Sequence, residues 1–191
     1  MLTFIKPFWA ICLLRLGPQD LPASRFLLGV TLAANLVCRT AVGGVYFSFP
    51  DAVAVATANL IIVFAMVAAL LQQNGKAERI VQTVTALAGV GTLLNLIALP
   101  LTVAIVAAQA RGADTASIEL LILALMCWNW AIVAHVLKHA LSIRFGTGAV
   151  LALVLIVVTY LILSAMFPNP AMRTIDASDH RILMPSEDPL R

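Results

Sequence analysis

LLGVTLAANLVCRTAVGGVYF, residues 27–47, is apolar almost throughout, yet it carries one permanently charged side chain, Arg39, near its middle. An apolar stretch of about 20 residues is what an α-helix needs to cross the hydrocarbon core of a bilayer. The rest of the chain has a matching composition, since 62% of its 191 residues are hydrophobic and 11% are charged. A soluble domain has about 25% charged residues. The composition therefore predicts that lipid, and not water, surrounds most of the chain.

Five segments are apolar over a length that reaches the roughly 20 residues of a membrane-spanning helix, namely 26–48, 52–72, 80–109, 118–141 and 148–167. The sequence therefore predicts an all-α integral membrane bundle of five transmembrane helices, within a domain of residues 17–167. SFPD at 48–51 has the form of a helix capping box with a proline in the first turn, which predicts a tight hairpin between the first two spans. Pro100 predicts a kink in the long third span, because proline removes a backbone hydrogen bond.

The two ends of the chain differ from the spans. Residues 1–16 contain an apolar run that is too short to cross a bilayer, and Lys6 and Arg15 flank it. We expect a short amphipathic helix lying in the membrane interface, with Trp9 at headgroup level. A secretory signal peptide is the alternative, although no small-residue cleavage site follows the run. Residues 168–191 are polar and rich in proline, which predicts an exposed carboxy-terminal tail.

The distribution of Lys and Arg predicts the orientation of the bundle. Seven of them lie on one predicted side, namely Lys6, Arg15, Arg25, Lys76, Arg79, Lys138 and Arg144, and two near the membrane on the other, Arg111 and Arg173. Cytoplasmic connections carry the excess of such residues, so we expect the amino terminus inside and the carboxyl terminus outside. An odd number of spans requires the same arrangement. We expect a multi-pass protein of the cell inner (cytoplasmic) membrane that meets anionic lipid headgroups at its inner face.

Arg39 must be accommodated within the first span. A charge at the centre of a membrane helix costs about 2.5–3.5 kcal/mol, and no Asp or Glu lies in the middle of any span to neutralise it. With the hairpin turn centred at 49–50, Arg39 lies level with Asn59, and Asn35 is one helical turn away. We expect Arg39 to point into the bundle and to donate hydrogen bonds to Asn59, Asn35 or the backbone oxygen of Leu96. An anionic ligand or an acidic partner chain is the alternative.

One asparagine lies near the middle of each of the first four spans, namely Asn35, Asn59, Asn95 and Asn129. Such side chains join helices in lipid with about 0.6 kcal/mol each. We expect them to form an intramembrane polar cluster with Arg39 and His135, and a hydrated path for a solute is the alternative.

The histidines and the motifs of the chain do not predict an enzyme or a cofactor. His135 and His139 lie four residues apart, but no further metal ligand is placed at their depth, so we expect no metal, no haem and no other cofactor. His135 is expected to be a buried hydrogen-bonding residue, with a proton relay as the alternative. No G-x-S-x-G, H-E-x-x-H or phosphate-loop motif occurs, so we expect a non-catalytic protein.

GPQDLPAS at 17–24 and WAIVAHVLKHAL at 130–141 resemble segments of short bacterial members of the Yip family, whose name comes from interaction with Ypt GTPases. The resemblance covers most of residues 10–167. It implies a five-span bundle that acts as a non-enzymatic membrane organiser or accessory factor. The eukaryotic relatives carry a longer cytosolic domain with an Asp-Leu-Tyr-Gly-Pro-type motif, of which this chain has only Asp20-Leu21-Pro22.

From these observations we expect an accessory or scaffold protein that associates, through its helix bundle, with other membrane proteins or with itself. The alternative is a small transporter or channel for an anion or polar solute, with Arg39 and the asparagines lining the path. Nucleic acid is not an expected partner.

Overall fold

The computed structural model describes residues 2–167, and its secondary structure within them is entirely helical. The elements in chain order are α1 (Leu2–Cys12), η1 (Pro18–Asp20), α2 (Arg25–Gly43), α3 (Phe49–Gln73), η2 (Ala77–Arg79), α4 (Ile80–Ala110), α5 (Ala116–Leu141) and α6 (Phe145–Met166). The predicted all-α class is confirmed. The expected tail at 168–191 lies outside the described residues.

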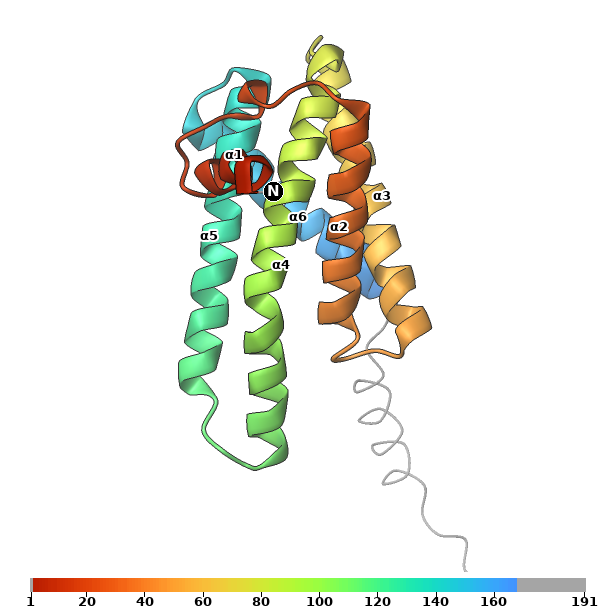
Figure 1. Cartoon of the computed structure of the whole chain (residues 1–191), viewed down its shortest axis with the longest axis vertical. Coiled ribbons are helices and arrows are strands. Elements are labelled where there is room, and N and C mark those ends of the chain that lie inside the picture. The colour runs from red at the N-terminus through yellow and green to blue at the C-terminus, as the bar shows by residue number, and fades with distance from the viewer. Residues whose placement is uncertain (1, 168–191) are drawn as a thin grey trace, which may run out of the picture.

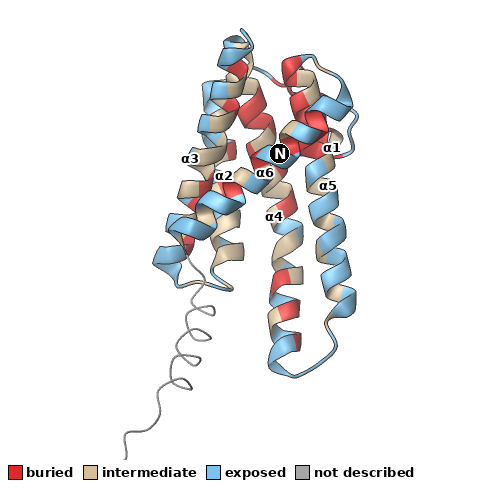
Figure 2. Ribbon diagram, turned by 180° about the vertical axis from the view of Figure 1, so that it is seen from behind, coloured by how far each residue is buried: buried red, intermediate tan, exposed pale blue. Residues whose placement is uncertain are grey.

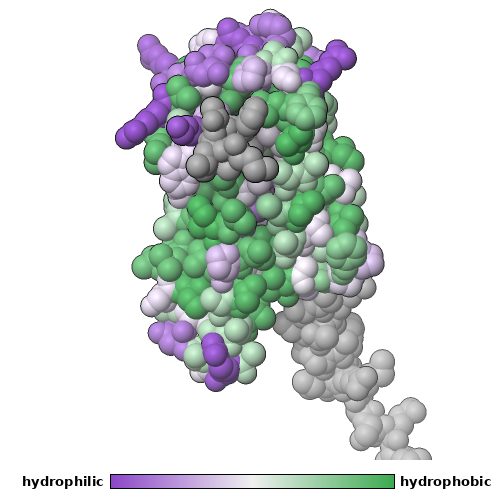
Figure 3. Space-filling model, in the orientation of Figure 1, coloured by the Kyte–Doolittle hydropathy of each residue, from purple (hydrophilic) through white to green (hydrophobic). Residues whose placement is uncertain are grey.

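Five of these helices, α2 to α6, are long and apolar enough to cross a membrane. Large apolar side chains are exposed along their outer faces, where a soluble protein would carry polar groups; examples are Val37, Ile61 and Leu161. Figure 3 shows the result as a broad apolar belt between two hydrophilic ends. The belt is the surface that lipid chains cover.

α4 lies in the middle of the bundle and contacts α2, α3 and α5. The α2–α3 hairpin lies on one side of α4 and α5 lies on the other (Figure 1). α6 crosses the bundle diagonally, because it begins beside α5 and ends beside α3. This diagonal course brings residues of α6 opposite all the other spans.

The first hairpin turns earlier than expected. α2 ends at Gly43, whereas the apolar stretch continues to residue 48. At this point Gly43 packs on α3, where an added Cβ would lie 3.4 Å from that of Ala52, an ordinary contact distance. The Ser48 hydroxyl caps α3, since it accepts from the Asp51 amide and donates to the Asp51 carboxylate at 2.6 Å. The reciprocal bond from the Ser48 amide, which would complete the predicted capping box, is not formed in the described chain. The first span is therefore 19 residues long.

The third and longest span, α4, is continuous from Ile80 to Ala110. Pro100 lies inside it and is exposed. α4 therefore stays helical on both sides of Pro100. The kink expected at this residue does not break the helix.

α1 lies across α4 and α5, part-way along the bundle (Figure 1). Its position in the membrane interface stays a prediction. Phe8 and Ile11 are buried in the core that α1 shares with α4 and α5. Gly89 allows α1 to pack this closely, because a Cβ there would lie 2.3 Å from the ring of Phe8. Trp9, on the outer face, is 46% exposed.

The two ends of the bundle carry opposite charge. One end holds the connections around η1, between α3 and α4, and between α5 and α6, and we call it the basic end. Its acidic residues are Asp20 and Glu78, and its basic residues are Arg15, Arg25, Lys76, Arg79, Lys138 and Arg144. The other holds the α2–α3 and α4–α5 connections; we call it the acidic end, and it has Asp51, Asp114 and Glu119 against Arg111. Buried residues gather towards the basic end (Figure 2). The buried residues of α5, for example, all lie from Ile132 onward.

Candidate functional site

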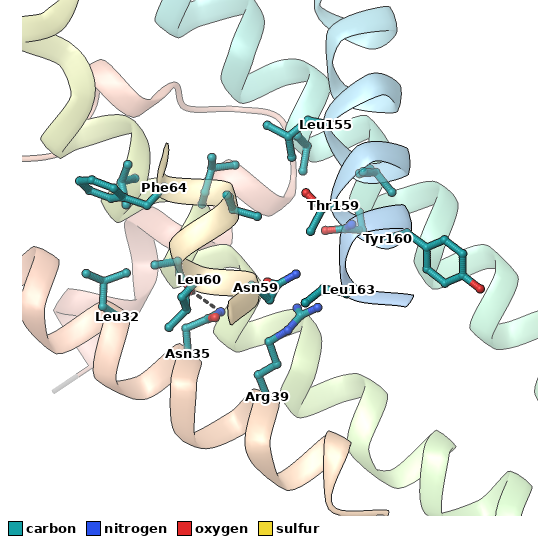
Figure 4. A pocket seen from close by; sticks show the side chains of 18 residues that line it. Leu32, Asn35, Arg39, Asn59, Leu60, Phe64, Leu155, Thr159, Tyr160 and Leu163 are labelled. Atoms are coloured by element: carbon teal, nitrogen blue, oxygen red, sulfur yellow. Dashed lines mark hydrogen bonds between the residues drawn. The ribbon is translucent and has the colours of Figure 1, made fainter. Parts of the chain in front are cut away.

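A cavity of about 290 Å³ lies between the five long helices. Each helix contributes to its wall, and the polar contributions come from Asn35 and Arg39 of α2, Asn59 of α3, Asn129 of α5 and Thr159 of α6 (Figure 4). The remaining wall is mostly apolar, with Phe64 and Leu155 among its residues. The arrangement is that of a small ligand site, namely a mostly apolar pocket with a few converging polar groups.

Arg39 supplies the only ionic group of this wall within the described chain. Its side chain points into the space between α3 and α6, beside Asn59 (Figure 4). Within residues 2–167 its guanidinium forms no hydrogen bond and no ion pair. The five N–H donors of a guanidinium are therefore open to a ligand or to water at this position.

The expected bonds from Arg39 to Asn59, Asn35 and the Leu96 oxygen are thus not formed in the described chain. The early end of α2 explains the difference. Arg39 lies four residues from Gly43, about 6 Å along the helix axis. It is therefore nearer to the end of the helix than the two turns expected from the sequence. Its long side chain reaches back into the bundle and ends in the cavity, without closing on an amide oxygen.

Asn35 forms a different interhelical bond. Its Nδ2 donates to the backbone oxygen of Ala88 in α4 at 3.1 Å, and this pair is buried. Gly91 leaves the room for it, because a Cβ at that position would lie 2.5 Å from the Asn35 amide nitrogen. Asn35 thereby joins α2 to α4 beneath Arg39 and fixes one wall of the cavity.

The other asparagines divide into two groups. Asn59 is buried, Asn129 is half-buried, and both line the cavity. Neither side chain forms a hydrogen bond within the described part of the chain, so both amides are available to a bound molecule. Asn95 does not line the cavity. The structure therefore brings three of the four asparagines together with Arg39.

Thr159 and Tyr160 of α6 line the cavity and were missed from the sequence. The signal was present, because they interrupt an otherwise apolar stretch of that helix. Their depth relative to Arg39 was not predictable, because it depends on the diagonal course of α6. The Thr159 hydroxyl lies 3.9 Å from the sulfur of Met66 and has no oxygen partner among the described residues.

His135 belongs to a separate polar contact on the other side of α5. Its Nε2 lies 3.1 Å from the backbone oxygen of Leu16, and its ring centre lies 4.5 Å from that of His139. Trp128 Nε1 donates to the backbone oxygen of Cys12 at 3.0 Å. These α5 side chains hold the α1 region in place and do not reach the cavity. In residues 2–167 no group of three or more His, Cys, Asp or Glu is placed to hold a metal ion.

The chemistry of the cavity favours an anion. A guanidinium pairs with carboxylate and phosphate through parallel N–H donors, and the amides of Asn59 and Asn129 add further donors. Among the described residues no carboxylate lines the cavity, so no charged group of that wall repels an anion. The long apolar walls provide no comparable interaction for a cation.

The fold and the cavity together define the class of the protein, which is a multi-pass all-α membrane protein. No family model, no curated protein and no solved structure matches the chain. The resemblance to the Yip family stays a sequence-based prediction.

Proposed function

We propose that this protein is a non-catalytic membrane protein that binds an anionic amphiphile in the cavity around Arg39. One observation carries the proposal: the guanidinium of Arg39 points into a cavity between the membrane-spanning helices and has no partner in the described chain. A guanidinium that stays unpaired between membrane-spanning helices is costly. A bound carboxylate or phosphate head supplies a partner.

The shape of the cavity favours an amphiphile over a small inorganic ion. Three of its polar groups, Arg39, Asn59 and Asn35, lie on one side, and the opposite side carries Phe64 and Leu155, with Thr159 as its polar group (Figure 4). At about 290 Å³ it holds an anionic head and the first carbons of a chain, but not a complete lipid. Tyr160 lies on the lipid side and is 70% exposed. The rest of the chain would leave past this residue into the bilayer.

Binding of dodecyl phosphate and of laurate to the purified protein in nanodiscs of phosphatidylcholine tests the proposal. We expect Arg39→Gln to weaken binding about 10- to 150-fold, because hydrogen bonds to a charged group contribute about 1.5–3 kcal/mol. Arg39→Lys retains the charge and should retain part of the affinity. Arg111→Gln is the matched control, because Arg111 lies in the exposed α4–α5 connection and does not line the cavity.

Two results would contradict the proposal. One is equal binding by wild type, Arg39→Gln and Arg111→Gln. The other is a large gain in affinity when the four carboxylates of residues 168–191 are neutralised, because Arg39 would then have a partner in that segment. If the same anion crosses the membrane of liposomes that contain the protein, and Arg39→Gln abolishes this flux, the site lies on a transport path.

A second candidate function is the accessory or scaffold role, and the exposed part of α5 favours it. Leu120, Leu123 and Met126 are each more than half exposed, and the α4–α5 hairpin extends past the α2–α3 turn (Figures 1 and 2). We propose that a helix of another membrane protein, or of a second copy, packs here. In a background with Cys12, Cys38 and Cys127 replaced by serine, Leu123→Cys should then give a defined disulfide-linked or bismaleimide-linked species in native membranes, and Leu153→Cys on α6 should not. Identical behaviour of the two variants would remove this candidate.

We further propose the cell inner membrane as the location, with the basic end on the cytoplasmic side. The charge difference between the two ends supports this orientation, because cytoplasmic connections are enriched in Lys and Arg. A membrane-impermeant maleimide added to intact cells should label a cysteine placed at Ala113, in the α4–α5 connection, and not one placed at Gly75. The reverse pattern would invert the orientation.

A further inference from the structure

A second cavity, of about 320 Å³, lies at the basic end. Four separate segments meet around it: η1, η2, the last turn of α5 and the α5–α6 connection. Its wall consists of Gln19, Arg79, Lys138, His139, Ser142 and Ile143. No carboxylate lines it. This cavity is distinct from the one around Arg39, since the two have no lining residue in common.

Arg79 is held in a fixed position by the end of α5. Its Nη1 donates to the backbone oxygens of His139 and Ala140, at 3.3 and 3.2 Å, and to the hydroxyl oxygen of Ser142 at 3.0 Å. These bonds satisfy carbonyl groups that every helix leaves free at its carboxyl end. They engage one of the two terminal nitrogens, and the other is not bonded within residues 2–167. Glu78 competes weakly, because its Oε1 lies 3.8 Å from Nε and its side chain is 69% exposed.

Lys138 and the neighbouring polar side chains complete the wall. The Lys138 ammonium group forms no ion pair among the described residues, and the side chain is half-buried. The amide of Gln19 lies 3.4 Å from Nδ1 of His139, which ties η1 to α5 at the cavity edge. Two cations, a hydroxyl and an amide therefore surround one space, and this is the donor set that proteins use for phosphate.

The location identifies which phosphate can reach the site. The basic end begins where the apolar belt stops (Figure 3), and this is the level of lipid headgroups. We propose that the cavity binds a phosphate group, namely that of an anionic phospholipid in the adjoining leaflet. The proposal does not depend on the Arg39 cavity, since neither site uses the other's residues.

Native mass spectrometry of the protein, released from nanodiscs that contain equal amounts of phosphatidylglycerol and phosphatidylcholine, tests the proposal. We expect one phosphatidylglycerol to be retained preferentially by wild type. Lys138→Gln should weaken this retention about fivefold, because one basic residue near a membrane surface contributes about 1 kcal/mol. Lys138→Arg should restore it. Arg144→Gln and Arg25→Gln are matched controls, because they remove the same charge at the same end without lining the cavity.

A uniform loss of retention in the Lys138, Arg144 and Arg25 variants would overturn the proposal, because it would show a general effect of surface charge. Unselective retention by wild type would also overturn it. Titration with inorganic phosphate distinguishes the source of the phosphate group: binding that depends on Lys138 without selective lipid retention would assign the cavity to a soluble phosphate. Thermal unfolding of each variant separates a lost site from a lost fold.

Discussion

Substitution of Gly148 by alanine tests how closely α5 and α6 approach each other. Gly148 is buried near the start of α6, and a Cβ there would lie 2.7 Å from the backbone oxygen of Ala134 and 3.2 Å from the backbone nitrogen of Lys138. The first distance is about 0.7 Å shorter than the 3.4 Å at which ordinary contact begins. Because the contacts are with backbone atoms, no side chain can move aside, and the two helices must separate.

Gly146→Ala is the matched control, since nothing lies within 4 Å of a Cβ at that position. Both variants gain the roughly 1 kcal/mol by which alanine exceeds glycine in a helix. Only Gly148→Ala adds the cost of overpacking, about 1–3 kcal/mol. The difference between the two variants is therefore about 1–3 kcal/mol. For a chain of this size it corresponds to about 2–12 °C in Tm.

Thermal unfolding in mild detergent, followed by tryptophan fluorescence, measures this difference. We expect Gly148→Ala to unfold at a lower temperature than Gly146→Ala. Equal Tm values would refute the close approach of α5 and α6. They would also remove the reason to place Thr159 opposite Arg39, because that placement depends on the course of α6 away from α5.

Two further predictions concern α1. Burial raises the pKa of the Cys12 thiol to about 11, so at pH 8 only about 0.1% of the thiol is the reactive thiolate. A variant with Cys12 as its single cysteine should therefore resist N-ethylmaleimide until it is denatured. Rapid labelling of the folded protein would contradict the burial of α1. Trp128→Phe removes the bond to the Cys12 oxygen, which is worth about 0.6 to 1.7 kcal/mol, so amide hydrogen exchange in α1 should accelerate about 3- to 20-fold. Trp130→Phe, which removes a bond to Ala149 instead, should leave that exchange unchanged.

The number of spans could be predicted because hydropathy is a local property of each segment. The inward direction of Arg39 was also predictable, since a guanidinium in lipid is too costly to face outward. The residue at which α2 ends was not predictable, because residues 44–47 are as apolar as the helix before them.

The positions that depend on distant parts of the chain were the ones that sequence patterns could not supply. Phe8 and Gly89 are separated by eighty residues and their contact has no periodic signal. The grouping of Arg39 with three of the asparagines was expected from the sequence, but the exclusion of Asn95 and His135 and the inclusion of Thr159 were not. Asn95 does not line the cavity because of the way α4 is rotated about its axis, and Thr159 lines it because α6 crosses the bundle diagonally.

The packing of α1 on α4 and α5 has a consequence for biosynthesis. α1 precedes α4 and α5 in the chain, so it is translated before the surface on which it packs, which is formed by Gly89 of α4 and the second half of α5. During that interval Phe8 and Ile11 have no protein partner and must wait at the surface of the bilayer. α1 can therefore take its native place only after α4 and α5 have been made, although it precedes both in the chain.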